Sequence, residues 1–211
     1  MPTLNFKGKS FVYNHHLAVK YHQLVPKPEL SLTDNVSLHD NLIIHGDNLK
    51  ALKALLPTYA GKIKCIYIDP PFNTGAAFEH YDDGLEHSIW LSLMKHRLEL
   101  LRVLLSPDGV IFVQIDYREG ARLKILMDEI FGSTCFKNEI IVRRGTKNVQ
   151  SQFETIGALA TGHDSLLLYS KKTDMRLLKL MALQEDVEPG KWDTFWRGTE
   201  RPTMRYELFG I

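Results

Sequence analysis

A carboxylate followed by two prolines and an aromatic residue is the part of this 211-residue sequence best suited to chemistry. The four residues are Asp69, Pro70, Pro71 and Phe72, which we call the acceptor corner. Because proline has no backbone N–H, the proline carbonyls and the Asp69 carboxylate can only accept hydrogen bonds. The exocyclic amino group of a planar base needs such acceptors, and a phenyl ring offers a stacking face worth about 1 to 3 kcal/mol. The alternative is a strand-ending turn with an exposed carboxylate and a core aromatic residue.

A strand is predicted directly before this corner. Residues 64–68 form a continuous run of β-prone side chains, which is typical of a strand covered on both faces. Upstream, residues 41–45 form a short apolar run, and residues 48–59 place four leucines on one helical face. We therefore expect a right-handed βαβ unit in which 41–45 and 64–68 are the strands.

Helical and strand patterns continue to alternate downstream. Residues 88–105 and 118–131 carry leucine and isoleucine at helical spacing, and residues 110–115 are typical of a second buried strand. Two further strands, over residues 139–142 and 165–169, could close the sheet. The alternation predicts an α/β fold with a doubly wound, mostly parallel, Rossmann-like sheet that is incomplete. Ligands of such sheets bind beyond the carboxyl ends of the strands, where the acceptor corner begins.

The composition is that of an ordinary folded protein and identifies no partner. Hydrophobic residues make up 44% and charged residues 24%, which excludes disordered, collagen-like and coiled-coil classes. The net charge is +1, so any basic surface must be local. Cys65 and Cys135 form no C-x-x-C pair, and no stretch approaches the roughly 20 apolar residues that a membrane span needs. We expect reduced thiols, a cytoplasmic location and no membrane association.

Residues 69–75 match the D-P-P-[YF] motif of amino-methylating DNA methyltransferases of the adenine-N6 type. The stretch 46–62 that leads into this motif resembles the modification (Mod) subunit of type III restriction-modification systems. Further segments that resemble the amino-terminal half of that family follow the same order along the chain: residues 2–5, 14–16, 109–116 and 163–169. The resemblance covers nearly the whole chain and rests on ordered motifs.

The resemblance implies an enzyme that transfers a methyl group from S-adenosylmethionine to adenine N6 in double-stranded DNA. A base inside a duplex must be extruded before such chemistry can occur. By resemblance, Asp69 and the Pro70 carbonyl would accept hydrogen bonds from adenine N6 while Phe72 stacks on the ring. These acceptors, on a corner stiffened by Pro71, would stabilise the positive charge that develops as the nitrogen attacks the methyl group.

The family also implies an order of parts, with the catalytic half first, a target-recognition region next and the cofactor motif F-x-G-x-G last. None of the 14 glycines forms a G-x-G pair. We therefore expect an irregular arm over residues 1–40, part of the methyltransferase domain over 41–180 and the start of a truncated recognition region over 181–211. We expect little activity from this chain alone.

Two residues beside a predicted strand end are candidates for the cofactor. The family pattern assigns Asp47 and Asn48, together with Asp69, to the binding of S-adenosylmethionine, and for Asp47 the structural alternative is a helix N-cap. We expect Asp116, at the end of the strand over 110–115, to be structural. The spacing of the histidines fits no ligand pair, so no metal is expected.

A compact basic loop follows the strand predicted over residues 139–142. It contains Arg143, Arg144 and Lys147, for which phosphate contacts are expected if the substrate is DNA. Exposed charge runs are usually only solvated surface, and that is the alternative here.

Three other functions remain open. A cytosine-N4 methyltransferase usually begins the motif with Ser, and an RNA or protein methyltransferase usually shows Asn-Pro-Pro-Tyr. A fragment without catalytic activity could instead hold a restriction subunit or a second copy of itself. We expect double-stranded DNA as the substrate, with a restriction subunit or a second copy of the chain as candidate protein partners.

Overall fold

The computed structural model describes residues 3–31, 37–39, 41–73, 77–78, 81–82, 86–143 and 162–176. The chain divides into two compact units, residues 1–175 and 176–211, and the fold lies in the first. The domain boundaries predicted at residues 40 and 180 stay predictions.

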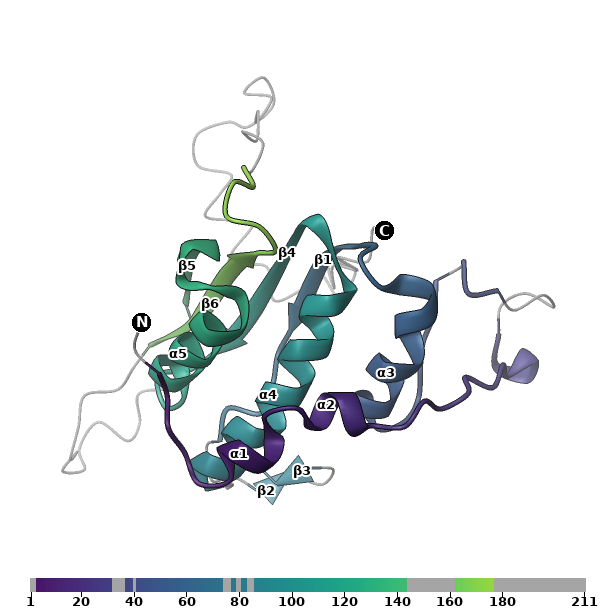
Figure 1. Cartoon of the computed structure of the whole chain (residues 1–211), viewed down its shortest axis with the longest axis horizontal. Helices are drawn as coiled ribbons and strands as arrows, with labels where there is room; N and C mark the ends of the chain where they lie inside the picture. Colours follow the sequence, from purple (N-terminus) through teal and green to yellow (C-terminus); the bar gives the residue numbers. More distant parts are fainter. Residues whose placement is uncertain are drawn as a thin grey trace, which may run out of the picture. The chain divides into compact units, whose positions relative to one another are not determined.

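A four-stranded sheet forms the centre of the first unit (Figure 1). Its order is β1 (Ile63–Ile68), β4 (Leu105–Ile115), β6 (His163–Ser170) and β5 (Phe136–Arg143). Strands β1 and β4 are parallel, whereas β6 is antiparallel to both of its neighbours. The predicted Rossmann-like α/β class is confirmed. The described sheet is nevertheless mixed and not mostly parallel, because β5 and β6 form an antiparallel pair.

Three long helices accompany the sheet: α3 (Asn48–Tyr59), α4 (His87–Leu104) and α5 (Gly120–Phe131). They lie next to one another in the order α3, α4, α5, and among the described elements they cover one face only (Figure 1). A doubly wound sheet has helices on both faces, whereas the described residues show helices on one face. The sheet residues alternate accordingly, since Ile111 and Val113 are fully buried whereas Phe112 and Gln114 are partly exposed.

The smaller elements complete the described chain. They are the helices α1 (Lys9–Val12) and α2 (His15–Ala18), the 3-10 helices over Pro28–Leu30 and Ser133–Cys135, and the hairpin of β2 (Ala77–Phe78) and β3 (Tyr81–Asp82).

Helix α4 supplies the largest part of the core. Trp90, Leu91, Met94 and Leu98 recur at helical spacing and are almost completely buried. Ile89, which is part of the helical spacing of apolar residues in this segment, is more than half exposed, because the buried stripe of the helix is centred on Trp90.

The strand predicted over residues 41–45 is wrong. These residues do not form a strand, and the side chain of Ile43 is fully exposed. The described sheet ends at β1, and this segment does not pair with the outer side of that strand. An apolar run becomes a strand only where a neighbour satisfies its backbone groups, so the parallel unit consists of β1, α4 and β4 instead.

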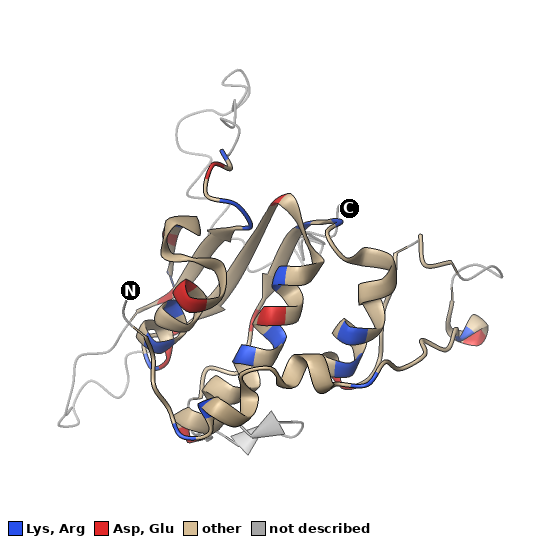
Figure 2. Ribbon diagram, in the orientation of Figure 1, with Lys and Arg blue, Asp and Glu red and all other residues tan. Residues whose placement is uncertain are grey.

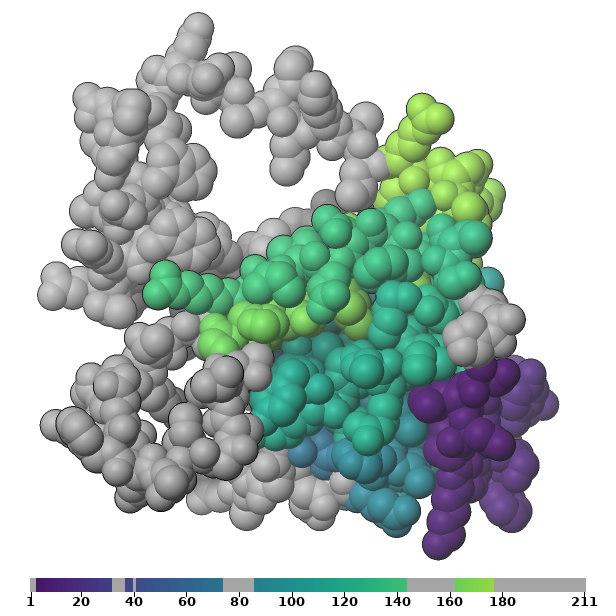
Figure 3. Space-filling view, turned by 90° about the vertical axis from the view of Figure 1, so that its left-hand side faces the viewer, coloured from purple at the N-terminus to yellow at the C-terminus, as the bar shows by residue number. Residues whose placement is uncertain are grey.

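The predicted arm contains two short helices, α1 and α2, that contact α4. Figure 3 shows the described residues of the arm, in purple, against the blue-green residues of the chain. Lys9 forms an ion pair of 2.8 Å with Glu129 of α5, and Lys53 of α3 donates a hydrogen bond of 3.1 Å to the carbonyl of His16. His16 also contacts Glu99 of α4. The arm is therefore irregular in sequence pattern but is tied to the helices by polar contacts.

His96 of α4 lies beneath this arm. Its ring centroid is 4.7 Å from that of His15, and its residue is about nine-tenths buried. Burial is the main reason that the pKa of His96 falls to about 4, and the positive groups of His15, Arg97, Lys95 and His16 lower it further. The folded chain therefore excludes a proton that the unfolded chain takes up near the ordinary pKa of 6.5.

This arrangement predicts a loss of stability in mild acid. A histidine whose pKa is depressed by folding destabilises the folded state progressively as the pH falls from 6.5 toward about 4. We expect the His96→Asn variant to lose about 2 to 3 kcal/mol less than the wild type between neutral pH and pH ~4.5. Urea unfolding at both pH values measures this difference. His22→Asn, at an exposed histidine, is the control. If wild type and His96→Asn lost the same free energy of unfolding between the two pH values, the lowered pKa of His96 would be contradicted.

Candidate active site

Three strands bring acidic residues to one edge of the sheet. Asp69 follows β1, Asp116 follows β4, and Asp164 lies at the start of β6. Because β6 is antiparallel, its first residues lie beside the last residues of β4, with Ser165 opposite Ile115. The carboxyl edge therefore collects side chains from strand ends and from a strand start.

A residue of the hydrophobic core binds the acceptor corner that follows β1. The indole N–H of Trp90 donates a hydrogen bond of 2.7 Å to the carbonyl of Pro71. Trp90 is fully buried in the first turn of α4, and a buried indole N–H needs an acceptor. The bond fixes the peptide that joins Pro71 to Phe72, so the corner is rigid at its second proline as well as through the proline rings.

The two side chains of the corner have different surroundings. The Asp69 side chain is exposed, whereas Phe72 is partly buried and packs against the hydrophobic core. This pairing agrees with the strand-ending alternative for Phe72. It leaves the Asp69 carboxylate as the accessible group of the corner.

Nearby carboxylates and partial burial change the protonation of this corner. The pKa of Asp69 is raised, mainly by desolvation and then by the negative charge of Asp164. The pKa of Tyr67 is raised by desolvation and then by the charges of Asp69 and Asp164. The edge of the sheet is therefore acidic, and its groups act on one another.

A chain of hydrogen bonds crosses the face of the sheet opposite the three long helices and reaches this edge. The hydroxyl of Tyr67 on β1 donates to the side-chain oxygen of Gln114 on β4. The side-chain amide of Gln114 in turn donates to Asp164 on β6 over 3.3 Å. The contacts link three adjacent strands and set the position of the buried Asp164 carboxylate.

Glu119 lies just behind the corner. It is fully buried immediately before α5, and its Oε1 accepts a hydrogen bond of 2.7 Å from the side-chain amide of Asn73. The same oxygen contacts Nδ1 of His87, the first residue of α4. Glu119 therefore joins the end of the corner to the start of the helix that carries Trp90.

Asp47 and Asn48 are bound to α4. One carboxylate oxygen of Asp47 caps α3 by accepting a hydrogen bond of 3.0 Å from the backbone N–H of Lys50, as the structural alternative predicts. Nε of Arg97 donates to the side-chain oxygen of Asn48 over 2.6 Å, and Arg97 also lies 3.9 Å from Asp47. Desolvation lowers the pKa of Arg97 despite the charge of Asp47. Cofactor binding by Asp47 and Asn48 stays a prediction.

Asp116 has the structural role that we expected. It is almost fully buried, and it accepts a hydrogen bond of 2.9 Å from the backbone N–H of Arg118 and another from the guanidinium of the same residue. These bonds turn the chain from β4 toward α5.

Only one residue of the predicted basic loop lies in the described part of the chain. Arg143 ends β5 and is exposed opposite His163, whereas Arg144 and Lys147 lie outside the described residues. Figure 2 shows basic and acidic positions interspersed along α4 and α5. The described helices thus present no single basic face in this view.

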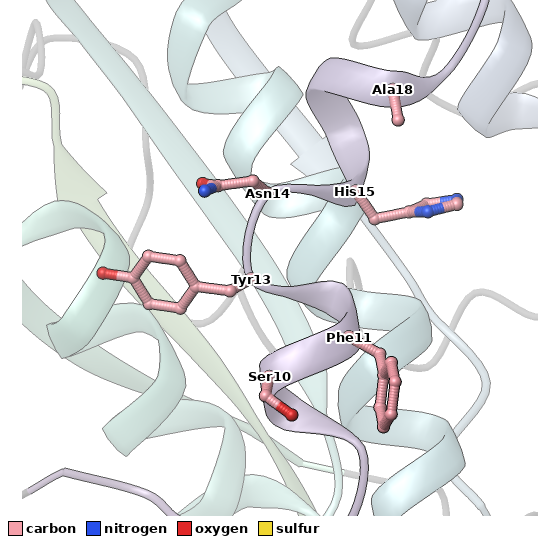
Figure 4. A pocket seen from close by; sticks show the side chains of 6 residues that line it. All are labelled: Ser10, Phe11, Tyr13, Asn14, His15 and Ala18. Atoms are coloured by element: carbon pink, nitrogen blue, oxygen red, sulfur yellow. The ribbon is translucent and has the colours of Figure 1, made fainter.

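The side chains that line a hollow on the arm do not form a second candidate active site. It is lined by Ser10, Phe11, Tyr13, Asn14, His15 and Ala18. In Figure 4 the side chains of Phe11, Tyr13 and His15 point in different directions and do not converge on a common point. Within the described ranges, no cluster of three His, Cys, Asp or Glu residues could hold a metal ion, and no helix is long and apolar enough to span a membrane.

Sequence reasoning identified the corner but missed the residues that hold it. Trp90 had a signal, since it belongs to the helical apolar pattern, but its indole bond is not visible in a sequence. Glu119 and Asp164 had almost no signal in the sequence, because Glu119 only precedes a helix and Asp164 only begins a strand.

Comparisons with known proteins place this chain in a family. Residues 63–200 match the DNA methylase family N6_N4_Mtase. The probable type III restriction-modification enzyme HindVI Mod subunit of Haemophilus influenzae is 50% identical over 115 residues, which are 54% of this chain and 15% of that protein. The type III StyLTI Mod subunit of Salmonella typhimurium is 33% identical over 225 residues, covering 90% of this chain and 34% of that protein.

A shorter relative shows the same similarity. The type II methyltransferase M.KpnI of Klebsiella pneumoniae is 39% identical over 188 residues, covering 78% of this chain and 43% of that protein. The chain thus spans less than half the length of each of these three relatives. The family match covers well over half of the chain and includes the acceptor corner, so this chain belongs to the DNA methylase family.

Proposed function

We propose that this chain is the catalytic part of an S-adenosylmethionine-dependent DNA methyltransferase that modifies adenine N6. The observation that carries the proposal is the Asp69-Pro70-Pro71 corner, which ends β1 and has its Pro71 carbonyl bound to the buried Trp90. Two of the similar proteins are Mod subunits of type III restriction-modification enzymes, which supports a role in such a system. A restriction subunit is then the expected protein partner.

The chemistry needs an acceptor that is fixed before the base arrives. An extruded adenine would place its N6 hydrogens on the Asp69 carboxylate and the Pro70 carbonyl. These acceptors keep the nitrogen lone pair available for attack, and they stabilise the positive charge on the amine without reorganising. Phe72 would lie beside the base, and Pro71 would keep the acceptors in place through its bond to Trp90.

S-adenosylmethionine supplies the electrophilic methyl group when it is bound. Asp47 and Asn48 would hold its adenosine side. The Asp47 side chain is half exposed, which leaves carboxylate surface for hydroxyl or amino donors of a ligand. The residues present therefore fit such a ligand, whose ribose hydroxyls and adenine amino group offer the donors that a carboxylate accepts.

Two other functions compete with this proposal. A cytosine-N4 methyltransferase would use the same acceptors on a different amine. An interaction fragment is favoured by apolar residues that β5 leaves exposed, of which Ile141 is more than half exposed. Light scattering with and without DNA tests the second idea, because stable self-association without DNA affinity would support it.

The proposal predicts that methyl transfer depends on Asp69. In the full product of the reading frame that encodes these residues, we expect Asp69→Ala to lower methyl transfer to DNA at least ~100-fold, because one preorganised acceptor is lost. Tritium transfer from labelled S-adenosylmethionine, followed by nucleoside analysis, measures both the rate and the modified base.

Asp108→Ala is the matched control for this experiment. Asp108 is an exposed carboxylate that pairs with Lys64 at the opposite end of β4, and its loss should leave the rate within about twofold. Methylation of cytosine N4 would overturn the base assignment, and full activity of Asp69→Ala would overturn the role of the corner.

The acidic edge predicts how Asp69 titrates. Because Asp164 raises the pKa of Asp69, Asp164→Asn should lower that pKa and keep Asp69 ionised, and able to accept, at lower pH. Carboxyl carbon NMR of the 211-residue chain, labelled at aspartate, follows this titration without any enzymatic activity. Asp174→Asn, at an exposed aspartate after β6, is the control. An unchanged or raised pKa of Asp69 in Asp164→Asn would contradict the coupling.

A further inference from the structure

We propose that Glu119 is the positioning residue of the acceptor corner, a role that rests on the proposed function of that corner. Glu119 contacts both ends of the segment that leaves the corner at Asn73 and returns at His87. It thereby fixes where Asp69 and Pro70 lie relative to an incoming base.

The carboxylate is bound where water cannot replace its partners. The Glu119 side chain has no exposed surface, and burying a charged carboxylate is costly unless polar groups surround it. Asn73 donates to Oε1 over 2.7 Å, His87 contacts the same oxygen, and Arg122 lies 3.4 Å from Oε2. Glu119 can therefore remain buried only while Asn73 and His87, the two ends of this segment, keep their positions.

The backbone at Asn73 supports the same conclusion. Its φ is 58°, in the left-handed region that residues other than glycine seldom adopt. Such a conformation persists where the surroundings hold it, and asparagine tolerates it better than most residues. The bond to Glu119 holds the Asn73 side chain directly after Phe72, so the turn that ends the corner is fixed from outside.

The contacts close a ring around the corner. Trp90 binds the Pro71 carbonyl and Glu119 binds Asn73, so the corner is held on both sides of Phe72. Glu119 also contacts His87, which lies one turn before Trp90 on α4. Movement of either anchor would therefore displace the other. A displacement of about 1 Å at reacting groups can cost about 100-fold in rate, which makes such a ring important for catalysis.

The test compares Glu119→Ala with Glu119→Gln. The glutamine retains an oxygen that can accept from Asn73, whereas alanine removes it. In the full product of the reading frame, we expect Glu119→Ala to lower kcat about 10- to 100-fold with KM for DNA within about twofold. Glu119→Gln should retain kcat within about fivefold, since it preserves the bond to the corner.

A second variant separates positioning from a failure to fold. Asn73→Gly keeps the left-handed backbone accessible and removes the side-chain bond to Glu119, so it should lower kcat about 10-fold without loss of the fold. The matched control is Glu129→Ala, because Glu129 is a mostly buried glutamate of α5 that pairs with Lys9 of the arm. Its loss should loosen residues 4–9 of the arm and leave kcat unchanged.

Hydrogen exchange of the 211-residue chain provides a readout that needs no methyl transfer. We expect Glu119→Ala to speed exchange of the amides of Asp69, Phe72 and Asn73 and of residues 87–91, and Glu129→Ala to speed it over residues 4–9 only. Unchanged exchange at 69–73 in Glu119→Ala, or an equal loss of kcat in the Ala and Gln variants, would overturn the positioning role. If Glu119→Ala loosens the corner while the wild type transfers no methyl group, the proposed function fails and the structural role of Glu119 stands.

Discussion

The need of a buried tryptophan for a hydrogen-bond acceptor connects the core of this protein to its candidate site. Trp90 lies in the apolar stripe of α4, where its ring packs without exposure but its indole N–H cannot remain unpaired. The Pro71 carbonyl provides the acceptor at 2.7 Å. Core packing of α4 therefore sets the position of the two prolines. A shift of this helix would also move the carboxylate of Asp69 beside them.

The mixed sheet explains the electrostatics of this edge. Parallel strands place only their last residues at the carboxyl edge, but the antiparallel β6 places its first residues there. Asp164 consequently lies close enough to Asp69 to raise its pKa, and Gln114 and Tyr67 connect Asp164 to the other two strands. An acidic edge of this kind favours a ligand that brings amino hydrogens or positive charge.

Local patterns in the sequence predicted the parts of the fold that local forces determine. The helix over 48–59 and the strand over 64–68 were predicted almost to the residue, and the acceptor corner lies at the strand end where it was expected. The strand over 41–45 was wrong because an apolar run does not reveal whether its backbone pairs with a neighbouring strand. The direction of β6 was also hidden, since strand patterns carry no orientation.

The contacts that hold the candidate site were not predictable in the same way. Trp90 and Pro71 are 19 residues apart, and Asn73 and Glu119 are 46 apart, so neither bond follows from a period or a motif. Glu119 resembles an ordinary charged residue before a helix until its complete burial is seen. The sequence thus predicted the candidate reacting groups, whereas the structure was needed to find the groups that contact them.

A crystal structure of the full protein with a target duplex and a non-reactive analogue of S-adenosylmethionine tests the central claim most directly. The account predicts an extruded adenine whose N6 lies within hydrogen-bond distance of the Asp69 carboxylate and the Pro70 carbonyl, with Trp90 still bound to Pro71. A base bound elsewhere on the sheet edge, or a corner whose bond to Trp90 is broken in the complex, would contradict it.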